Sequence, residues 1–83
     1  MDVQSKVRNM VANIAGVSAN SISDSTSFRN DLGLSESQVL KIGVDVDYEF
    51  KLGGSVEKLK LTDSVEEISR FVSNDMPTLQ RYK

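Results

Sequence analysis

The 83-residue chain contains no cysteine and no histidine. Without cysteine it can form neither disulfides nor thiolate metal sites. Without histidine it lacks the commonest general base and the commonest zinc ligand, which argues against most hydrolytic and metal-dependent chemistry. A nucleophile–base pair is difficult to assemble from the residues that remain, so we expect a protein that is not itself an enzyme and that holds no metal.

A strong charge imbalance and long apolar runs are also missing. The 10 basic and 12 acidic residues give a formal net charge of −2, and the basic residues are scattered, so no nucleic-acid interface is predicted. No apolar run approaches the length of a membrane span, and the N-terminus begins directly in an amphipathic pattern without a signal-peptide core. The sequence therefore predicts a cytoplasmic monomer that binds neither nucleic acid nor membrane.

The remaining composition is that of one folded domain, because hydrophobic residues make up 39% of the chain and a chain of this length can bury one modest core. Near the N-terminus, apolar residues recur every three or four positions, which predicts a helix with one apolar stripe. Asp2 is placed to cap the start of this helix, and Gly16 is placed to close its end. Residues 18–27 are rich in Ser, Asn and Asp, so we expect a long loop pinned to the core by Ile22 and Phe28.

The second helix is predicted to begin near Ser35, since Ser35 and Gln38 match a capping box in which each side chain bonds the backbone of the other. Its inward face contains Gly43, which costs about 1 kcal/mol of helix propensity and so predicts a closely packed neighbour. Gly53-Gly54 is expected to end this helix.

A short helical turn is expected after Ser55. The last main helix is expected to begin at Ser64, with Glu67 as its capping partner. Asn74 and Pro77 are expected to end it, because proline lacks a backbone N–H and crowds the preceding turn.

These patterns predict an all-α fold, a four-helix bundle with three main helices, one short helix and a long loop between the first two. Residues 1–76 are expected to form the domain, and residues 77–83 a polar C-terminal tail. The predicted core consists of apolar residues from every helix and from the long loop: Val7, Val11, Ile14, Ile22, Phe28, Leu32, Val39, Leu40, Val46, Phe50, Leu59, Leu61, Ile68, Phe71 and Val72.

One constellation of short motifs spans most of the chain. It consists of Gly16-Val17 after the first helix, Ile22 in the loop, Phe28-Arg29-Asn30-Asp31-Leu32-Gly33-Leu34 before the second helix, Tyr48-Glu49-Phe50 at its end, and Ser64-Val65-Glu66-Glu67-Ile68 at the start of the last helix. In this order and with this ungapped spacing, the pieces resemble the acyl carrier protein family.

The resemblance implies an acyl-carrier-protein-like bundle that carries acyl intermediates on a 4'-phosphopantetheine arm, in lipid or secondary-metabolite biosynthesis. In the family, this arm is esterified to a serine, usually within Asp-Ser-Leu, at the start of the second helix. The N-terminal amides and the positive end of the helix dipole favour the phosphate at that place.

The chain departs from the family at the attachment point. Ser35-Glu36-Ser37 stands where the family has Asp-Ser-Leu, so Glu36 occupies the serine position and cannot form the phosphodiester. Three interpretations stay open. In the first, Ser35 is only a helix cap and Glu36 complements the helix dipole. In the other two, the attachment point has moved to Ser37 or to Ser35.

The resemblance also implies that partner enzymes dock on the second helix. These partners would be acyl transferases, synthases or ligases and, for loading, a phosphopantetheinyl transferase. The candidate contact residues on this helix are Gln38, Lys41, Val44, Asp45 and Tyr48.

The alternative function is a carrier-derived interaction or regulatory module that is never phosphopantetheinylated.

One further motif, Asp45-Val46-Asp47-Tyr48-Glu49, mimics the opening of a calcium-binding loop. The required glycine position is Phe50 and the closing carboxylate position is Val56, so no calcium site is predicted.

Overall fold

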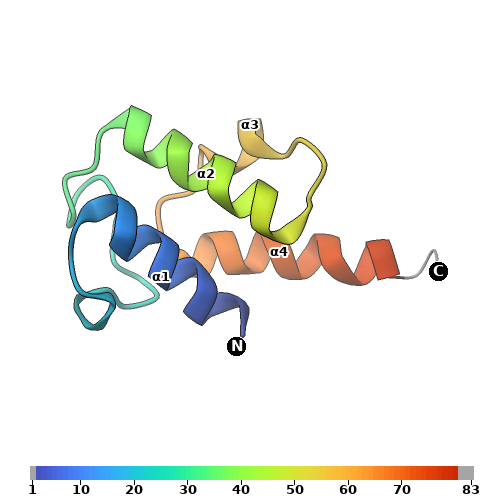
Figure 1. The fold of residues 1–83 in the computed structure, drawn as a ribbon, viewed down its shortest axis with the longest axis horizontal. Helices are drawn as coiled ribbons and strands as arrows, with labels where there is room; N and C mark the ends of the chain where they lie inside the picture. Colours follow the sequence, from blue (N-terminus) through green and yellow to red (C-terminus); the bar gives the residue numbers. More distant parts are fainter. Residues whose placement is uncertain (1, 81–83) are drawn as a thin grey trace.

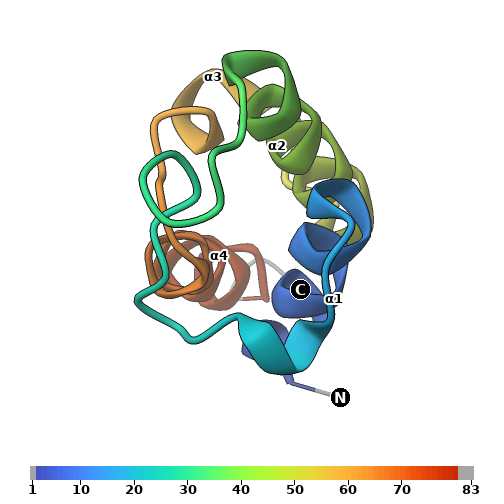
Figure 2. The ribbon, with the colours of Figure 1, turned by 90° about the vertical axis from the view of Figure 1, so that its left-hand side faces the viewer.

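The computed structural model describes residues 2–80, with side chains described as far as residue 74. Four α-helices follow in order, α1 (Val3–Ala15), α2 (Glu36–Phe50), α3 (Val56–Leu59) and α4 (Val65–Gln80), with a short 3-10 turn at Ala19–Ser21. The described part of the chain contains no strand, so the prediction of a small all-helical fold is confirmed. Viewed from one end, α1, α2 and α4 surround a common centre and α3 lies beside α2 (Figures 1 and 2).

The predicted caps of α1 are confirmed, whereas the predicted end of α2 is not. The Asp2 carboxylate accepts a hydrogen bond from Ser5 N at 2.8 Å, and Gly16 closes α1 in the left-handed conformation with φ 73°. α2, however, ends at Phe50 and is capped by Lys51, a non-glycine residue with φ 53°, so the prediction that Gly53-Gly54 ends this helix is wrong. Both glycines also have positive φ and lie in the loop that follows.

The core forms where α1, α2 and α4 meet. Of the predicted residues, most are buried, and Ile14, Leu32, Phe50 and Phe71 are partly buried against the same cluster. Among the residues whose side chains the structure describes, the buried apolar ones are Val7, Val11, Ala12, Ile22, Phe28, Leu34, Val39, Ile42, Val46, Leu59, Val65, Ile68 and Val72.

Two predicted core residues are wrong, because Leu40 and Leu61 are 42% and 74% exposed. The inward stripe of α2 contains Val39, Ile42 and Val46, which share one face at spacings of three and four residues. Leu40 lies one position, about 100° of helical rotation, away from Val39 and so turns toward solvent. Leu61 lies beyond the end of α3, where no helix covers it.

The short helix α3 packs closely on α2. A Cβ atom added at Gly43 would lie 3.3 Å from the Cβ of Leu59 and 3.6 Å from the backbone N of Lys60. Leu59 itself is 1% exposed. The predicted close neighbour of Gly43 is therefore confirmed, and it is α3.

α4 begins after Ser64, whose hydroxyl accepts from Glu67 N at 3.2 Å. The Glu67 carboxylate accepts from Asp63 N, at 2.8 Å, and not from Ser64 N, so the reciprocal half of the predicted capping box is shifted by one residue. The prediction that α4 ends at Asn74 and Pro77 is wrong, since the helix continues to Gln80. Proline removes one donor and crowds the preceding turn, but it leaves the residues that follow free to be helical. Residues 81–83 of the predicted tail lie outside the described residues.

Within residues 2–80, no helix is both long enough and apolar enough to span a bilayer.

Candidate functional site

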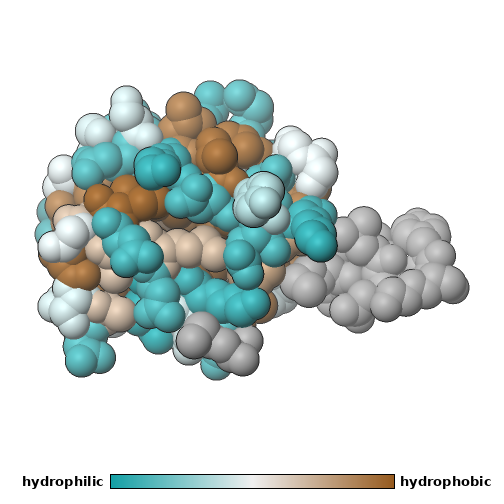
Figure 3. All heavy atoms as spheres, in the orientation of Figure 1, coloured by the Kyte–Doolittle hydropathy of each residue, from teal (hydrophilic) through white to brown (hydrophobic). Residues whose placement is uncertain are grey.

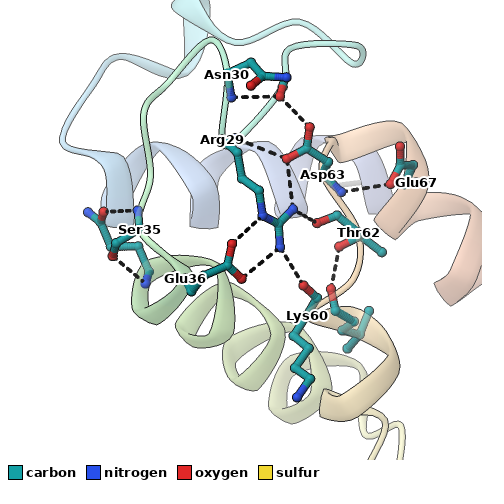
Figure 4. Close-up of polar contacts among 11 residues, drawn as sticks. Arg29, Asn30, Ser35, Glu36, Lys60, Thr62, Asp63 and Glu67 are labelled. Atoms are coloured by element: carbon teal, nitrogen blue, oxygen red, sulfur yellow. Dashed lines mark hydrogen bonds and ion pairs between the residues drawn. The ribbon is translucent and has the colours of Figure 1, made fainter.

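The Arg29 guanidinium lies at the centre of a polar cluster beside the start of α2 (Figure 4). Its Nε and Nη2 donate to the two carboxylate oxygens of Glu36 at 2.8 and 3.3 Å, which makes a bidentate ion pair. Its Nη1 donates to the Thr62 carbonyl and the Asp63 carboxylate, at 3.1 and 3.0 Å, and its Nη2 also donates to the Lys60 carbonyl at 2.8 Å. These bonds use all five N–H donors of the guanidinium, so Arg29 joins α2 to the segment between α3 and α4.

Asp63 links this cluster to the loop before α2. Its carboxylate accepts from Arg29 N at 3.1 Å and from the Ser27 hydroxyl, while its carbonyl accepts from Phe28 N at 2.8 Å. The Ser27 hydroxyl oxygen in turn accepts from Asn30 N at 3.0 Å. Because Phe28 is fully buried, the backbone around it is fixed, and Arg29 is directed toward α2.

The charges of the cluster stabilise one another. Hydrogen bonds from Arg29, and its positive charge, lower the pKa of Glu36 below its usual value. Burial opposes ionisation of Asp63, but the hydrogen bonds from Ser27 and Arg29 outweigh it, so the pKa of Asp63 is also lowered. The hydrogen bond to Glu36 is the largest contribution that raises the pKa of Arg29. At neutral pH all three groups are therefore charged.

The three residues at the predicted attachment point, Ser35, Glu36 and Ser37, have different environments. The Ser35 hydroxyl accepts from Gln38 N at 3.2 Å, and Ser35 N donates to the Gln38 side-chain oxygen at 2.9 Å, so the predicted capping box is confirmed. Glu36 is held by Arg29. Ser37, on the first turn of α2, is exposed, and among the described residues its hydroxyl has no hydrogen-bond partner.

A groove of about 360 Å³ lies between α2 and α3 beside this region. Ser37, Leu40 and Leu61 contribute its neutral lining. Two ion pairs line the rest, Arg29–Glu36 and the Glu57–Lys60 pair, whose nearest atoms are 2.9 Å apart. The groove therefore combines an apolar pair, a hydroxyl and compensated charges.

The predicted partner-binding residues lie along the outer side of α2. Lys41, Val44 and Tyr48 are exposed, whereas Gln38 and Asp45 are half-buried and Gln38 is used by the capping box. Val44 and Tyr48 are 48% and 84% exposed and, with Leu40, form a stripe at intervals of four residues. Hydrophobic side chains reach the surface over α2 and α3 in Figure 3.

Sequence reasoning did not identify Arg29 or Asp63 as site residues. A signal for Arg29 was present, because a cation seven residues before a carboxylate at a helix N-terminus can reach it across a short loop. Nothing in the sequence indicated that Asp63, 34 positions further along, would join the same cluster.

Comparison with protein-family models gives no match for this chain, and comparison with curated proteins gives no relative. The function is therefore inferred from the residues and the geometry of the site.

Proposed function

We propose that this chain is an acyl-carrier-protein-like domain that presents an acyl intermediate to enzymes docking on α2, with the intermediate attached through 4'-phosphopantetheine at Ser37. The observation that supports it most is the Ser37 hydroxyl, which is exposed, engaged with no described residue, and placed on the first turn of α2 at the edge of the groove. The motif around Asp31-Leu32-Gly33 and the helical order provide the link to carrier proteins.

The residues around Ser37 suit a phosphodiester. The N-terminal amides of α2 and the positive end of its dipole favour a phosphate at the first turn. Glu36 would repel a phosphate if its charge were free, but that charge is compensated by Arg29. Lys60, paired with Glu57, lines the same groove, and Leu40 and Leu61 offer an apolar surface beside it. The arm would supply the flexible tether that carries the intermediate.

A second candidate is a carrier-derived interaction module that is never loaded. The observation that favours it is the bidentate ion pair between Arg29 and Glu36, because Glu36 stands at the position of the family's serine. With the capping box of Ser35 also complete, the start of α2 is stabilised without an arm. In this candidate the exposed stripe of Leu40, Val44 and Tyr48 binds a partner protein directly.

Intact mass after incubation with coenzyme A and a broad-specificity phosphopantetheinyl transferase tests both candidates. We expect addition of a single phosphopantetheine to the wild-type chain and to Ser35→Ala, and none to Ser37→Ala. Addition that survives in Ser37→Ala and disappears in Ser35→Ala would move the attachment point to Ser35.

The Glu36→Ser variant gives the test of the second candidate, because it restores the family's serine. If this variant is loaded while the wild-type chain is not, the transferase recognises the domain but finds no acceptor in it. That result would contradict loading at Ser37 and favour the unloaded interaction module. Circular dichroism of each variant establishes that the helices are retained.

A further inference from the structure

Lys41 lies about one helical turn after Ser37 on the outward side of α2. Both side chains are exposed, and residues four apart in a helix are neighbours, with Cβ atoms about 5–6 Å apart. The Lys41 ammonium takes part in no ion pair with a described residue. α2 therefore presents a free cation within reach of the hydroxyl that the proposed function assigns to the arm.

The other charged groups around Ser37 are already paired. In the groove beside it, Arg29 bonds Glu36, and Lys60 pairs with Glu57, their nearest atoms 2.9 Å apart. A phosphate on Ser37 can draw either cation only by releasing a carboxylate, and that carboxylate then repels the phosphate across the groove. The unpaired lysine one turn along α2 releases no such charge, so a phosphate at this position recruits it more easily.

The direction of the helix also favours the contact. Cα–Cβ bonds in an α-helix tilt toward its N-terminus, so the Lys41 side chain leans back over the turn that contains Ser37. An anion four residues before a lysine is the more favourable order for an ion pair on a helix surface. The N-terminal amides of α2 attract the same phosphate. The amides, the helix direction and the free ammonium therefore act together.

We propose that Lys41 pairs with a phosphate carried on Ser37 and thereby positions the arm along the outward side of α2. The inference rests on the proposed function, because the natural phosphate is the phosphodiester of the 4'-phosphopantetheine arm. Its negative charge neutralises that of Lys41 on the side of α2 where Val44 and Tyr48 are exposed. Loaded and unloaded chains then differ by a free positive charge on the surface that partner enzymes would contact.

The full chain with phosphoserine incorporated at residue 37 tests this pairing without any transferase. Phosphoserine releases its second proton near a pKa of about 6, and phosphorus NMR follows that titration. A cation beside the phosphate favours the doubly charged form, so the midpoint should lie lower with Lys41 present than in Lys41→Gln. We expect a difference of about 0.2–0.4 pH units at low salt, as for a helix pair of this spacing. Equal midpoints would overturn the proposal.

Lys51→Gln is the matched control, since it removes the same charge at the other end of α2, about 20 Å from Ser37. It should move the midpoint by less than about 0.1 pH units, because that distance exceeds the screening length. The paired carboxylates of Glu36 and Glu57 are the same in every variant, so their effect cancels in the comparison. Equal shifts in Lys41→Gln and Lys51→Gln would show a general effect of net charge and would contradict a specific pair.

Lys41→Arg and added salt check the nature of the contact. The arginine keeps the charge and should keep the lowered midpoint, whereas high ionic strength should bring wild type and Lys41→Gln together. Circular dichroism of each variant establishes that the helices are retained. The pairing and the loading fail separately. A chain that no transferase loads would contradict the proposed function without altering the phosphoserine titration, and a midpoint independent of Lys41 would refute the pairing even where Ser37 is loaded.

Discussion

Replacing Asp63 with alanine tests whether the polar cluster beside α2 stabilises the fold. The substitution removes three hydrogen bonds that reach Asp63, from the Ser27 hydroxyl, from Arg29 N and from Arg29 Nη1. It leaves the bond from Phe28 N to the carbonyl of residue 63, because that bond uses only the backbone. The change therefore separates the side-chain contribution from the chain path.

The expected loss follows from the charge and exposure of Asp63. A hydrogen bond to a charged group contributes roughly 1.5–3 kcal/mol when it is well buried. The Asp63 side chain is 30% exposed, so water satisfies part of what is lost and the contributions cannot simply be added. We expect the free energy of unfolding to fall by about 2 kcal/mol.

Urea denaturation followed by circular dichroism measures this loss. For a domain of this size the dependence on urea is roughly 1 kcal/mol per molar, so the midpoint should fall by about 2 M. Asp31→Ala is the matched control, since among the described residues the Asp31 carboxylate accepts one hydrogen bond, from Ser27 N at 2.8 Å. This substitution should lower the free energy of unfolding by about 0.5–1 kcal/mol. A loss for Asp63→Ala no larger than that of the control would refute the assignment of Asp63 as the centre of the cluster.

The pH dependence of the same pair of proteins has a definite sign. The pKa of Asp63 is lowered from its ordinary value of 3.8, so folding favours the ionised carboxylate. Its contribution is fully present above pH 3.8 and is lost as the pH falls through the lower pKa of the folded state. The urea midpoints of wild type and Asp63→Ala should therefore converge as the pH falls below 3.8. A difference that stays constant throughout acid titration would contradict the origin of the lowered pKa.

Two matched pairs of substitutions in α2 complete the predictions, both measured by urea denaturation. Ser35→Ala should lower the free energy of unfolding by about 1 kcal/mol, because it removes the helix cap. Ser37→Ala should change that free energy by less than about 0.5 kcal/mol, because the Ser37 side chain bonds no described residue. Val46→Ala should lower the free energy of unfolding by about 2 kcal/mol, because it leaves a cavity at a fully buried site. Val44→Ala, at a side chain that is 48% exposed, should lower it by less than about 0.5 kcal/mol. Similar losses within either pair would show that the stated contacts do not decide stability.

The helices of this chain were largely predictable because their signals are local. The cap of Asp2, the capping box of Ser35 and the need for a close neighbour at Gly43 each depend on residues within a few positions or on a single residue type. The errors occur where a local signal competes with a wider context. Lys51 ends α2 before the glycines because a non-glycine residue can adopt the left-handed conformation at a modest cost.

The exposed positions of Leu40 and Leu61 were not predictable from apolarity alone. Burial depends on which neighbouring helix covers a face, and the four residues of α3 cover Gly43 without covering Leu40. An exposed leucine is ordinary at a protein surface, but two of them beside one groove form a feature that only the packing of α2 and α3 creates.

The candidate site itself was predictable only in part, since Ser35, Glu36 and Ser37 are consecutive while their partners are distant in sequence. Glu36 alone is compatible with a simple interaction with the helix dipole. The bidentate bond from Arg29 gives it a different role, because it joins the start of α2 to the segment after α3. Substituting serine at residue 36 would therefore do two things together: it would supply a hydroxyl and it would remove the ion pair with Arg29. Loading and stability must be measured separately in that variant, and Glu36→Gln, which removes the charge of the ion pair without supplying a hydroxyl, separates them.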